Sequence, residues 1–312
     1  MSDHIPALLS QVLTLMAPAA GLSYLDATFG CGGHARALLE AQPSCRVVAL
    51  DCDPMVQPYV EGLRGYFGAR FQFYDLNFAS LDQVAESGFA GVLFDLGVSS
   101  FQLDKAERGF SFRMEGPADM RMDPRLGSPA SDFLERASEE AIVVAVRDYG
   151  EEQQWRRVVR ALMAARGTGC LRTTSDLAVT IAKAVGTQRT ARRRRIHPAT
   201  RTFQGLRMAV NGELAALERA LPCAFDRLAP DGVLVVISFH SLEDRYVKRY
   251  FKRLAGLAEH AGDGRPQQER SQMAELLTRR PVRPDAFEVA RNPRSRSAKL
   301  RAVRKLKQSE LV

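Results

Sequence analysis

The fold of this chain is decided by one stretch, which reads Asp26-Ala27-Thr28-Phe29-Gly30-Cys31-Gly32-Gly33-His34. A short apolar run at residues 22–26 precedes the glycines, and a helical pattern of apolar residues follows them at 34–41. Glycines let a backbone approach a ligand closely, and the start of a helix presents N–H groups without intrahelical partners. The stretch therefore predicts a strand, a ligand-binding turn and a helix in succession.

The spacing around the turn favours one kind of cofactor. Asp51 ends the next apolar run, about twenty residues after Gly30, where a carboxylate accepts hydrogen bonds from a ribose. The turn is not G-x-G-x-x-G but D-x-x-x-G-x-G-G, with an acid before the glycines. That acid suits the ammonium group of S-adenosylmethionine, which has no pyrophosphate to bind. A dinucleotide site and a turn without a ligand stay open as alternatives.

Further apolar runs at 46–50, 70–74 and 91–94 predict buried parallel strands, because they do not alternate with polar residues. Ligands bind beyond the carboxyl ends of such strands. Phe78 follows the third strand and is interpreted as a cover for an adenine ring or as a core aromatic. Asp95 and Gln102 follow the fourth strand, as cofactor ligands or as helix-capping and loop residues.

This strand–helix alternation stops after about residue 105 and returns before residue 233. We predict three segments: a first part of an α/β domain (1–105), a helical substrate-recognition insert (106–212), and a second part with a basic tail (213–312). Helices are expected at 131–137, 139–149, 151–166, 175–185, where Thr174-Ser175-Asp176 supplies the cap, and 206–221, which ends at Pro222. A strand at 233–238, a helix at 241–254, a mobile loop at 259–285 and an edge strand at 297–303 complete the prediction.

Composition and charge restrict the function. The 312 residues are 46% hydrophobic, and the net charge of +8 divides into −6 for residues 1–100 and +14 for residues 101–312. A basic second part is expected of a protein that binds a polyanion, although it also fits a solvated surface. No apolar run spans a membrane, no secretory signal starts the chain, and five scattered cysteines fit a reducing cytoplasm.

Eight motifs in this order resemble the bacterial ribosomal RNA small-subunit methyltransferase H family. They are Gly32-Gly-His34, Asp95-Leu-Gly-Val-Ser-Ser100, Gln102-Leu-Asp104, Glu107-Arg-Gly-Phe-Ser-Phe112, Asp119-Met-Arg-Met-Asp123, Tyr149-Gly-Glu151, His197-Pro-Ala-Thr-Arg-Thr-Phe-Gln204 and Ser238-Phe-His-Ser-Leu-Glu-Asp-Arg245. The likeness extends from His4 to about Lys305. It implies a class I S-adenosylmethionine-dependent methyltransferase, a Rossmann-like α/β sheet with an inserted all-helical domain. The reaction it implies is methylation of N4 of a cytidine in 16S ribosomal RNA.

The resemblance also implies the cofactor contacts. By motif, S-adenosyl-L-methionine is expected to bind Gly32, Gly33, His34, Asp51, Phe78, Asp95 and Gln102. This chain departs from the family pattern at Cys31 and Cys52, where arginine is common, at Phe101, where proline is usual, and at Gly205, where alanine is usual. The chain lacks the Asn/Asp-Pro-Pro-aromatic tetrad of many amino-methyltransferases, so its catalytic group stays open. The candidates for orienting the target amine are Asp95, Asp104 and Asp119.

The expected partner is 16S ribosomal RNA or the small ribosomal subunit, with no membrane; a homodimer is kept open. The basic residues expected to hold phosphates are Arg189, Arg192–Arg195, Arg201, Arg207, Lys248, Arg249, Lys252, Arg253 and the tail from Arg291 to Lys307. His197 and His240 lack a third ligand at suitable spacing, so no metal is predicted. Two rival functions remain: a methyltransferase acting on DNA or protein, and a non-catalytic RNA-binding or assembly factor.

Overall fold

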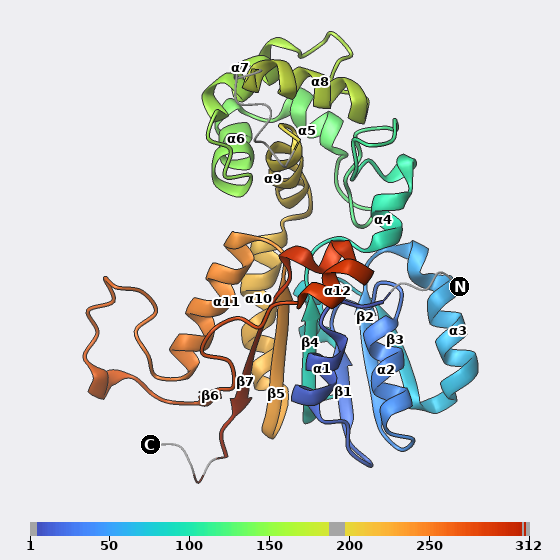
Figure 1. The fold of residues 1–312 in the computed structure, drawn as a ribbon, viewed down its shortest axis with the longest axis vertical. Coiled ribbons are helices and arrows are strands. Elements are labelled where there is room, and N and C mark those ends of the chain that lie inside the picture. Colours follow the sequence, from blue (N-terminus) through green and yellow to red (C-terminus); the bar gives the residue numbers. More distant parts are fainter. Residues whose placement is uncertain (1–4, 187–196, 308, 310–312) are drawn as a thin grey trace. The chain divides into compact units, whose positions relative to one another are not determined.

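The computed structural model describes residues 5–186, 197–307 and 309, and its chain divides into two compact units (Figure 1). The sheet unit comprises Met1–Gly97 and Ala215–Val312, and the helical unit comprises Val98–Leu214. Among the described residues, no helix combines the length and the apolar character needed to cross a bilayer.

The sheet unit is built on seven strands in the order β3-β2-β1-β4-β5-β7-β6. Their bounds are β1 Ser23–Asp26, β2 Arg46–Asp51, β3 Phe71–Asp75, β4 Phe89–Asp95, β5 Leu228–Ser238, β6 Ala274–Leu276 and β7 Lys299–Lys305. All neighbouring pairs are parallel except those of β7, which runs antiparallel to β5 and β6. The strand order reverses between β1 and β4, and doubly wound sheets bind ligands at such a reversal. The predicted Rossmann-like α/β fold is confirmed.

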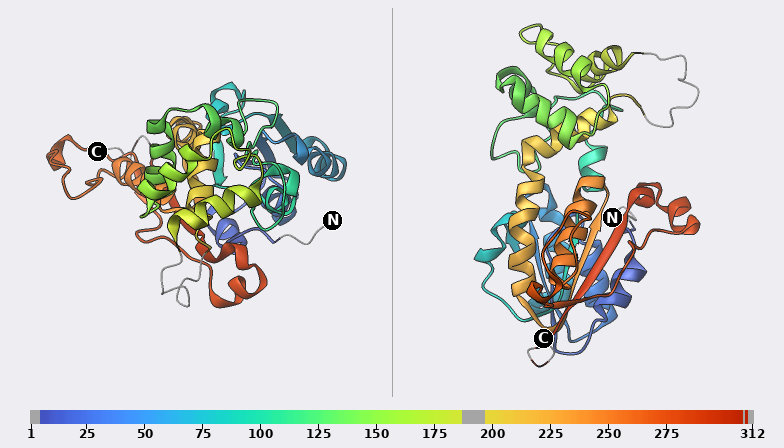
Figure 2. Two further views of the ribbon diagram at one scale, coloured as in Figure 1. Left: turned by 90° about the horizontal axis from the view of Figure 1, so that it is seen from above. Right: turned by 90° about the vertical axis from the view of Figure 1, so that its left-hand side faces the viewer.

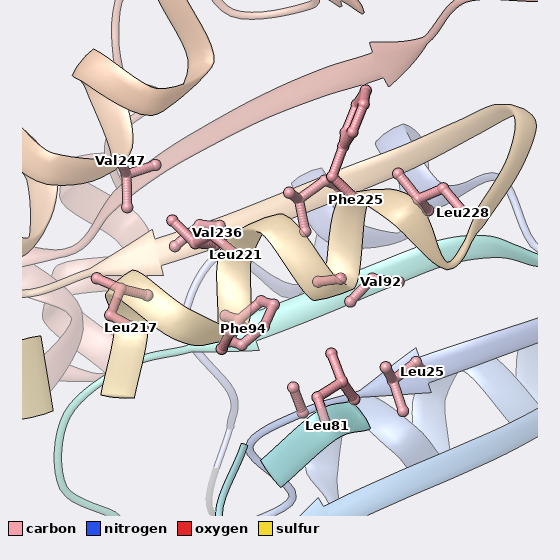
Figure 3. Close-up of a cluster of buried hydrophobic side chains, with 14 of the residues drawn as sticks. Leu25, Leu81, Val92, Phe94, Leu217, Leu221, Phe225, Leu228, Val236 and Val247 are labelled. Atoms are coloured by element: carbon pink, nitrogen blue, oxygen red, sulfur yellow. The ribbon is translucent and has the colours of Figure 1, made fainter. Parts of the chain in front are cut away.

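Helices cover both faces of this sheet (Figure 2, right). On one side lie α1 (Leu9–Met16), α2 (Gly33–Ala41) and α3 (Gln57–Phe67). On the other lie α10 (Glu213–Asp226) and α11 (Ser241–Leu254). Figure 3 shows how α10 fills the second face: Leu217, Leu221 and Phe225 point toward strands β4 and β5. Burying these apolar side chains on both faces explains why the strands read as continuous apolar runs.

The helical unit contains α4 (Ser100–Asp104), α5 (Ala130–Arg136), α6 (Glu139–Val143), α7 (Trp155–Ala164), α8 (Thr174–Val185) and α9 (Thr200–Asn211). A π-helical segment, η5 (Val144–Tyr149), directly continues α6. The unit has its own apolar core, with Leu134, Leu162, Ile181 and Leu206 fully buried. The predicted helices at 131–137 and 175–185 are confirmed, but α8 is capped by the Thr173 hydroxyl, which accepts the Asp176 N–H at 3.2 Å.

Three predictions of secondary structure are wrong. The helix expected at 206–221 is two helices, because Gly212 adopts a left-handed conformation (φ 60°) that ends α9, and α10 continues past Pro222. The strand expected at the edge of the sheet, β7, lies between β5 and β6. The region expected as a mobile loop, 259–285, contains β6, whose three residues are too few to show an alternating pattern. The domain boundaries given above stay a prediction.

Candidate functional site

The glycine turn is shaped by close contacts within the sheet unit. Gly32 has φ 75°, and a Cβ on it would lie 2.7 Å from the ring of Phe29. A Cβ on Gly33, the first residue of α2, would overlap the ring of Pro6. The Gly32 N–H donates to the Phe29 carbonyl at 2.8 Å. The turn therefore requires glycine at both positions, because the Phe29 and Pro6 rings occupy the space that a side chain would need.

Asp51 holds this turn against the end of β2. One oxygen of its carboxylate, Oδ2, accepts the Gly30 N–H at 2.7 Å, and the other accepts the Asp53 N–H at 2.9 Å. A carboxylate oxygen has two lone pairs, so both oxygens keep capacity for a ligand hydroxyl. The structure thus brings Asp51 to the turn, as its spacing predicts, and adds a supporting role that the spacing does not reveal.

Thr28 connects the turn to the end of β4. Its hydroxyl oxygen accepts the Asp95 N–H at 2.6 Å, and its own N–H donates to Asp26 Oδ1 at 3.1 Å. These two hydrogen bonds join Asp26, Thr28 and Asp95 into one network at the point where the strand order reverses. Sequence reasoning missed Thr28, whose only signal was its place inside the turn.

His34 and Asp95 face each other beneath the turn. His34 Nε2 lies 3.5 Å from Asp95 Oδ2, and the His34 side chain is 5% exposed. Neither ring nitrogen of His34, nor Asp95 Oδ1, has a hydrogen-bond partner among the described residues. Buried polar atoms in folded proteins are normally paired, so these three atoms are candidates for contacts with a ligand.

The carboxylates of Asp26, Asp51 and Asp95 lie close together around the turn, with few positively charged side chains near them. Asp26 and Asp51 have no lysine or arginine nitrogen within 4.0 Å in the described part of the chain, and the ion-pair partner of Asp95 there is His34. Burial raises the pKa of Asp26 and of Asp51 to about 6. Like charges brought together in a poorly hydrated site favour a cation as ligand. The residues therefore fit a positively charged nucleoside cofactor.

We expect the Asp26 carboxylate to make the protein's stability fall as the pH rises. The folded state holds the Asp26 proton up to a pH of about 6, whereas an unfolded aspartate loses it near pH 4. Its stabilising contribution is therefore complete below about pH 4 and is lost as the pH passes through about 6. Asp26→Asn keeps an acceptor for Thr28 but does not titrate. Relative to wild type, it should gain on the order of 2 kcal/mol between pH 4 and pH 7 in urea unfolding.

The control for this measurement is Glu61→Gln, on the exposed side of α3. Its unfolding free energy relative to wild type should change little over the same pH range. An Asp26→Asn difference that stays constant from pH 4 to pH 7 would contradict the assignment.

Phe78 follows β3 and lies at the same end of the sheet. Its ring packs edge-on against Phe94 at a centroid distance of 5.7 Å, and it is half-buried. The contact with Phe94 fits the interpretation of Phe78 as a core aromatic. The accessible part of its ring fits the other interpretation, a cover for an adenine ring. Nearby, Asn77 Nδ2 donates to Cys52 Sγ at 3.7 Å, and Cys31 hydrogen-bonds to Tyr59. Cys31 and Cys52, at the two positions where the resemblance implies arginine, therefore have local polar partners.

The other predicted residues lie in the helical unit. Gln102 is buried on α4, where its side-chain oxygen accepts the Ser99 N–H at 2.9 Å as part of a capping box. Asp104 is exposed at the end of α4. Asp119 is held by Arg121 through two hydrogen bonds of 2.7 and 2.8 Å. Burial raises the pKa of Asp119, but the hydrogen bonds from Arg121 outweigh it and lower the pKa overall.

Where the structure describes them, the basic residues predicted to hold phosphates fall into two groups: some bond to other parts of the protein, and others are exposed. Arg189 and Arg192–Arg195 lie outside the described residues. Arg207 is paired with Glu213 through two bonds of 2.7 Å, and Lys252 Nζ donates to the Ala258 carbonyl. In the tail, Arg301 is 7% exposed and bonded to Asp244 at 2.7 Å. These side chains hold the fold, whereas Lys248 and Arg249 are exposed.

The two histidines considered as metal ligands make local contacts. His240 caps α11 by accepting the Leu242 N–H on Nδ1 at 3.3 Å, and His197 accepts the Ala199 N–H at 3.2 Å. Across residues 5–186, 197–307 and 309, no three histidine, cysteine or acidic side chains form a group that could hold a metal ion.

Together, the strand reversal and the glycine turn define a Rossmann-like protein with a candidate cofactor site at the carboxyl ends of its parallel strands. The profile described as the MraW methylase family matches residues 1–306. A relative from Thermomicrobium roseum, named Ribosomal RNA small subunit methyltransferase H, is 47% identical, covering 98% of this chain and 94% of its own. One of the same name from Methylobacterium nodulans is 44% identical, with 97% and 90% covered. The chain therefore belongs to the MraW methylase family, which confirms the predicted family and its methyltransferase class.

Proposed function

We propose that this chain uses S-adenosylmethionine to methylate N4 of a cytidine in 16S ribosomal RNA. The observation that carries the proposal is the cluster of Asp26, Asp51 and Asp95 around the glycine turn, which has no lysine or arginine partner among the residues that the structure describes. The sulfonium and ammonium groups of S-adenosylmethionine supply the missing positive charge. The relatives named as small-subunit ribosomal RNA methyltransferases support the RNA substrate.

Each cofactor-binding residue has a proposed role. Asp51, already fixed by the Gly30 and Asp53 amides, accepts the ribose hydroxyls. Gly32 gives the turn its left-handed bend, and Gly33, the first residue of α2, presents its backbone N–H to the amino-acid end, beside His34. Phe78 covers the adenine with the exposed part of its ring. Gln102 remains part of the proposal as a residue that follows β4 in the chain.

When bound, S-adenosylmethionine supplies a methyl group made electrophilic by the sulfonium. The chain must hold the target nitrogen in line with that methyl at about 3–3.5 Å, because the cytosine N4 lone pair is delocalised and weakly nucleophilic. Asp95 Oδ1, which lacks a partner among the described residues, accepts a hydrogen bond from N4–H and orients the lone pair. The proton leaves the nitrogen after methyl transfer, so Asp95 need not act as a strong base.

Thr28 should matter for turnover because it accepts the Asp95 N–H. Thr28→Val keeps the side-chain shape but leaves that N–H without its acceptor, so we expect kcat to fall about tenfold. The dissociation constant for S-adenosylmethionine should change much less. Thr28→Ser restores the hydroxyl and should restore kcat. Equal kcat for wild type and Thr28→Val would rule out this positioning role.

The helical insert (106–212) is proposed as the substrate-recognition domain, and the cytoplasm as the location of the enzyme. A base within a helix must be unstacked before it can be methylated, so accessible single-stranded RNA is the favoured substrate. The homodimer kept open above is tested by sedimentation of the purified chain.

One experiment tests the function directly. Small-subunit particles and naked 16S RNA are incubated with the protein and labelled S-adenosylmethionine, and the digested RNA is analysed by mass spectrometry. We expect a single N4-methylated cytidine. Label in DNA or protein instead would support the rival methyltransferases. Failure to bind S-adenosylmethionine in calorimetry would support a non-catalytic RNA-binding factor.

A further inference from the structure

A segment near the C-terminus forms a fixed excursion from the sheet unit. Val282 and Leu300 close its base with two backbone hydrogen bonds of 2.9 Å. Between them lies the short helix α12 (Ala286–Arg291), labelled in red in Figure 1. The excursion is fastened at its middle, because Glu288 Oε1 accepts the Leu8 N–H at 2.8 Å and Asn292 Nδ2 donates to the Ile5 carbonyl at 2.9 Å. Its surface is therefore held in one arrangement.

The same contacts place this excursion beside the cofactor turn. Ile5, which accepts from Asn292, directly precedes Pro6. The Pro6 ring in turn lies against Gly33 of the turn. A ligand lying over the excursion would thus be adjacent to the edge of the sheet where the methyl group is transferred.

Exposed arginines lie in this excursion and in the residues just before it, between positions 279 and 296. Arg279, Arg280, Arg283, Arg291 and Arg296 are all exposed, and none has a carboxylate within 4.0 Å in the part of the chain that the structure describes. Two arginines of β7, by contrast, are paired: Arg301 with Asp244 at 2.7 Å, and Arg304 with Glu275 at 2.7 Å. The paired arginines therefore stabilise the fold, whereas the charge of the exposed arginines between residues 279 and 296 is available to a partner.

The acidic residues of the segment do not neutralise this charge. Asp285 accepts the Glu288 N–H at 2.7 Å to cap α12, and Glu288 accepts from Leu8. Between residues 279 and 296 these are the two acids against six arginines. Self-repulsion of this kind is unfavourable for the fold alone, and it is relieved when a polyanion binds.

An exposed aromatic ring lies among these charges. Phe287 on α12 is 68% exposed, and the Arg291 guanidinium lies over its ring with 5.4 Å to the centroid. Exposed phenylalanine is unfavourable in water, whereas proteins that bind single-stranded nucleic acids use such rings to stack bases beside a basic surface.

We propose that residues 279–296 bind single-stranded RNA next to the methyl-transfer site, with Phe287 stacking on a base and the arginines holding phosphates. This inference rests on the proposed function and deepens it, by naming the surface that receives RNA flanking the target cytidine. Phosphates make the binding strong and sensitive to salt, and the stacked base makes it selective for single strands over duplex.

The stacking contact is tested with a labelled single-stranded RNA of about 12 nucleotides. Phe287→Ala should weaken binding about tenfold, and Phe287→Tyr, which keeps a stacking ring, should bind like wild type. Tyr66→Ala is the matched control, because Tyr66 is 77% exposed but lies outside the basic segment. Its RNA affinity should not change, and S-adenosylmethionine affinity should be unchanged in all three variants.

The phosphate contacts are tested by salt titration. Replacing Arg279, Arg280 and Arg283 together with glutamine should reduce the slope of log affinity against log salt by about 2. Arg36→Gln is the control, because Arg36 is exposed but paired with Glu40 at 2.7 Å.

The outcomes separate this inference from the proposed function. If wild type methylates small-subunit particles while Phe287→Ala and the triple variant bind RNA as wild type does, the inference is overturned and the function stands. If Phe287→Tyr loses affinity as Phe287→Ala does, the ring acts through the fold rather than by stacking, and the inference is also overturned. If wild type neither binds nor methylates RNA, both proposals fail.

Discussion

Replacing Asp51 with alanine is expected to weaken S-adenosylmethionine binding about 100-fold, in calorimetry at neutral pH. Two effects add to give this size. The variant removes the acceptor of the Gly30 and Asp53 N–H groups, which hold the turn at 2.7 and 2.9 Å. It also removes the proposed acceptor of the ribose hydroxyls. Hydrogen bonds to a charged group contribute about 1.5–3 kcal/mol each, so losing both roles reaches this range.

The variant Asp51→Asn distinguishes the two roles. Its amide oxygen can still accept one backbone N–H, but the negative charge is absent, so we expect an intermediate loss of affinity. Glu61→Gln, on the exposed side of α3, is the control and should bind like wild type. Wild-type affinity in Asp51→Ala would exclude this carboxylate from the cofactor site.

The turn and the strand ends around it could be predicted because local sequence determines them. The apolar runs identify buried strands, and the spacing from Gly30 to Asp51 places both at one end of the sheet. Thr28 could not be predicted, because its bond to Asp95 joins two segments that are distant in sequence. The role of Arg301 also depends on a carboxylate distant in sequence, Asp244, whereas Arg207 pairs with Glu213 six residues on, across the helix end at Gly212. Composition could not separate either arginine from those available to RNA.

The errors in helix boundaries have a local physical cause. Pro222 lacks an N–H, which argues for a helix end, but α10 continues through it. Both Pro222 and Glu218, one turn earlier, are exposed, so water can hydrogen-bond the carbonyl that the proline leaves without a donor. The true boundary was marked by Gly212, since glycine in a left-handed conformation commonly ends a helix.

Two glycines, Gly150 and Gly205, lie where helix α9 packs closely against the π-helical segment η5. Gly205 on α9 faces the backbone of Ala145 and Gly150, which belong to the π-helical segment and its end. A Cβ at position 205 would overlap the Ala145 carbonyl oxygen and lie 2.6 Å from the Gly150 nitrogen. Because these are backbone atoms, they cannot turn aside as a side chain could. The resemblance implies alanine at this position. In this chain, however, α9 and the π-helical segment lie so close together that only glycine fits.

Gly205→Ala is therefore expected to destabilise the protein by about 3 kcal/mol, although alanine has the higher helix propensity. Thermal unfolding followed by circular dichroism should show a lower Tm. Gly62→Ala is the matched control: Gly62 also lies within a helix, α3, but a Cβ there meets nothing within 4 Å. The control should gain about 0.5–1 kcal/mol from lower backbone entropy in the unfolded chain. If both variants were stabilised alike, α9 would have room at position 205, and the close crossing would be wrong.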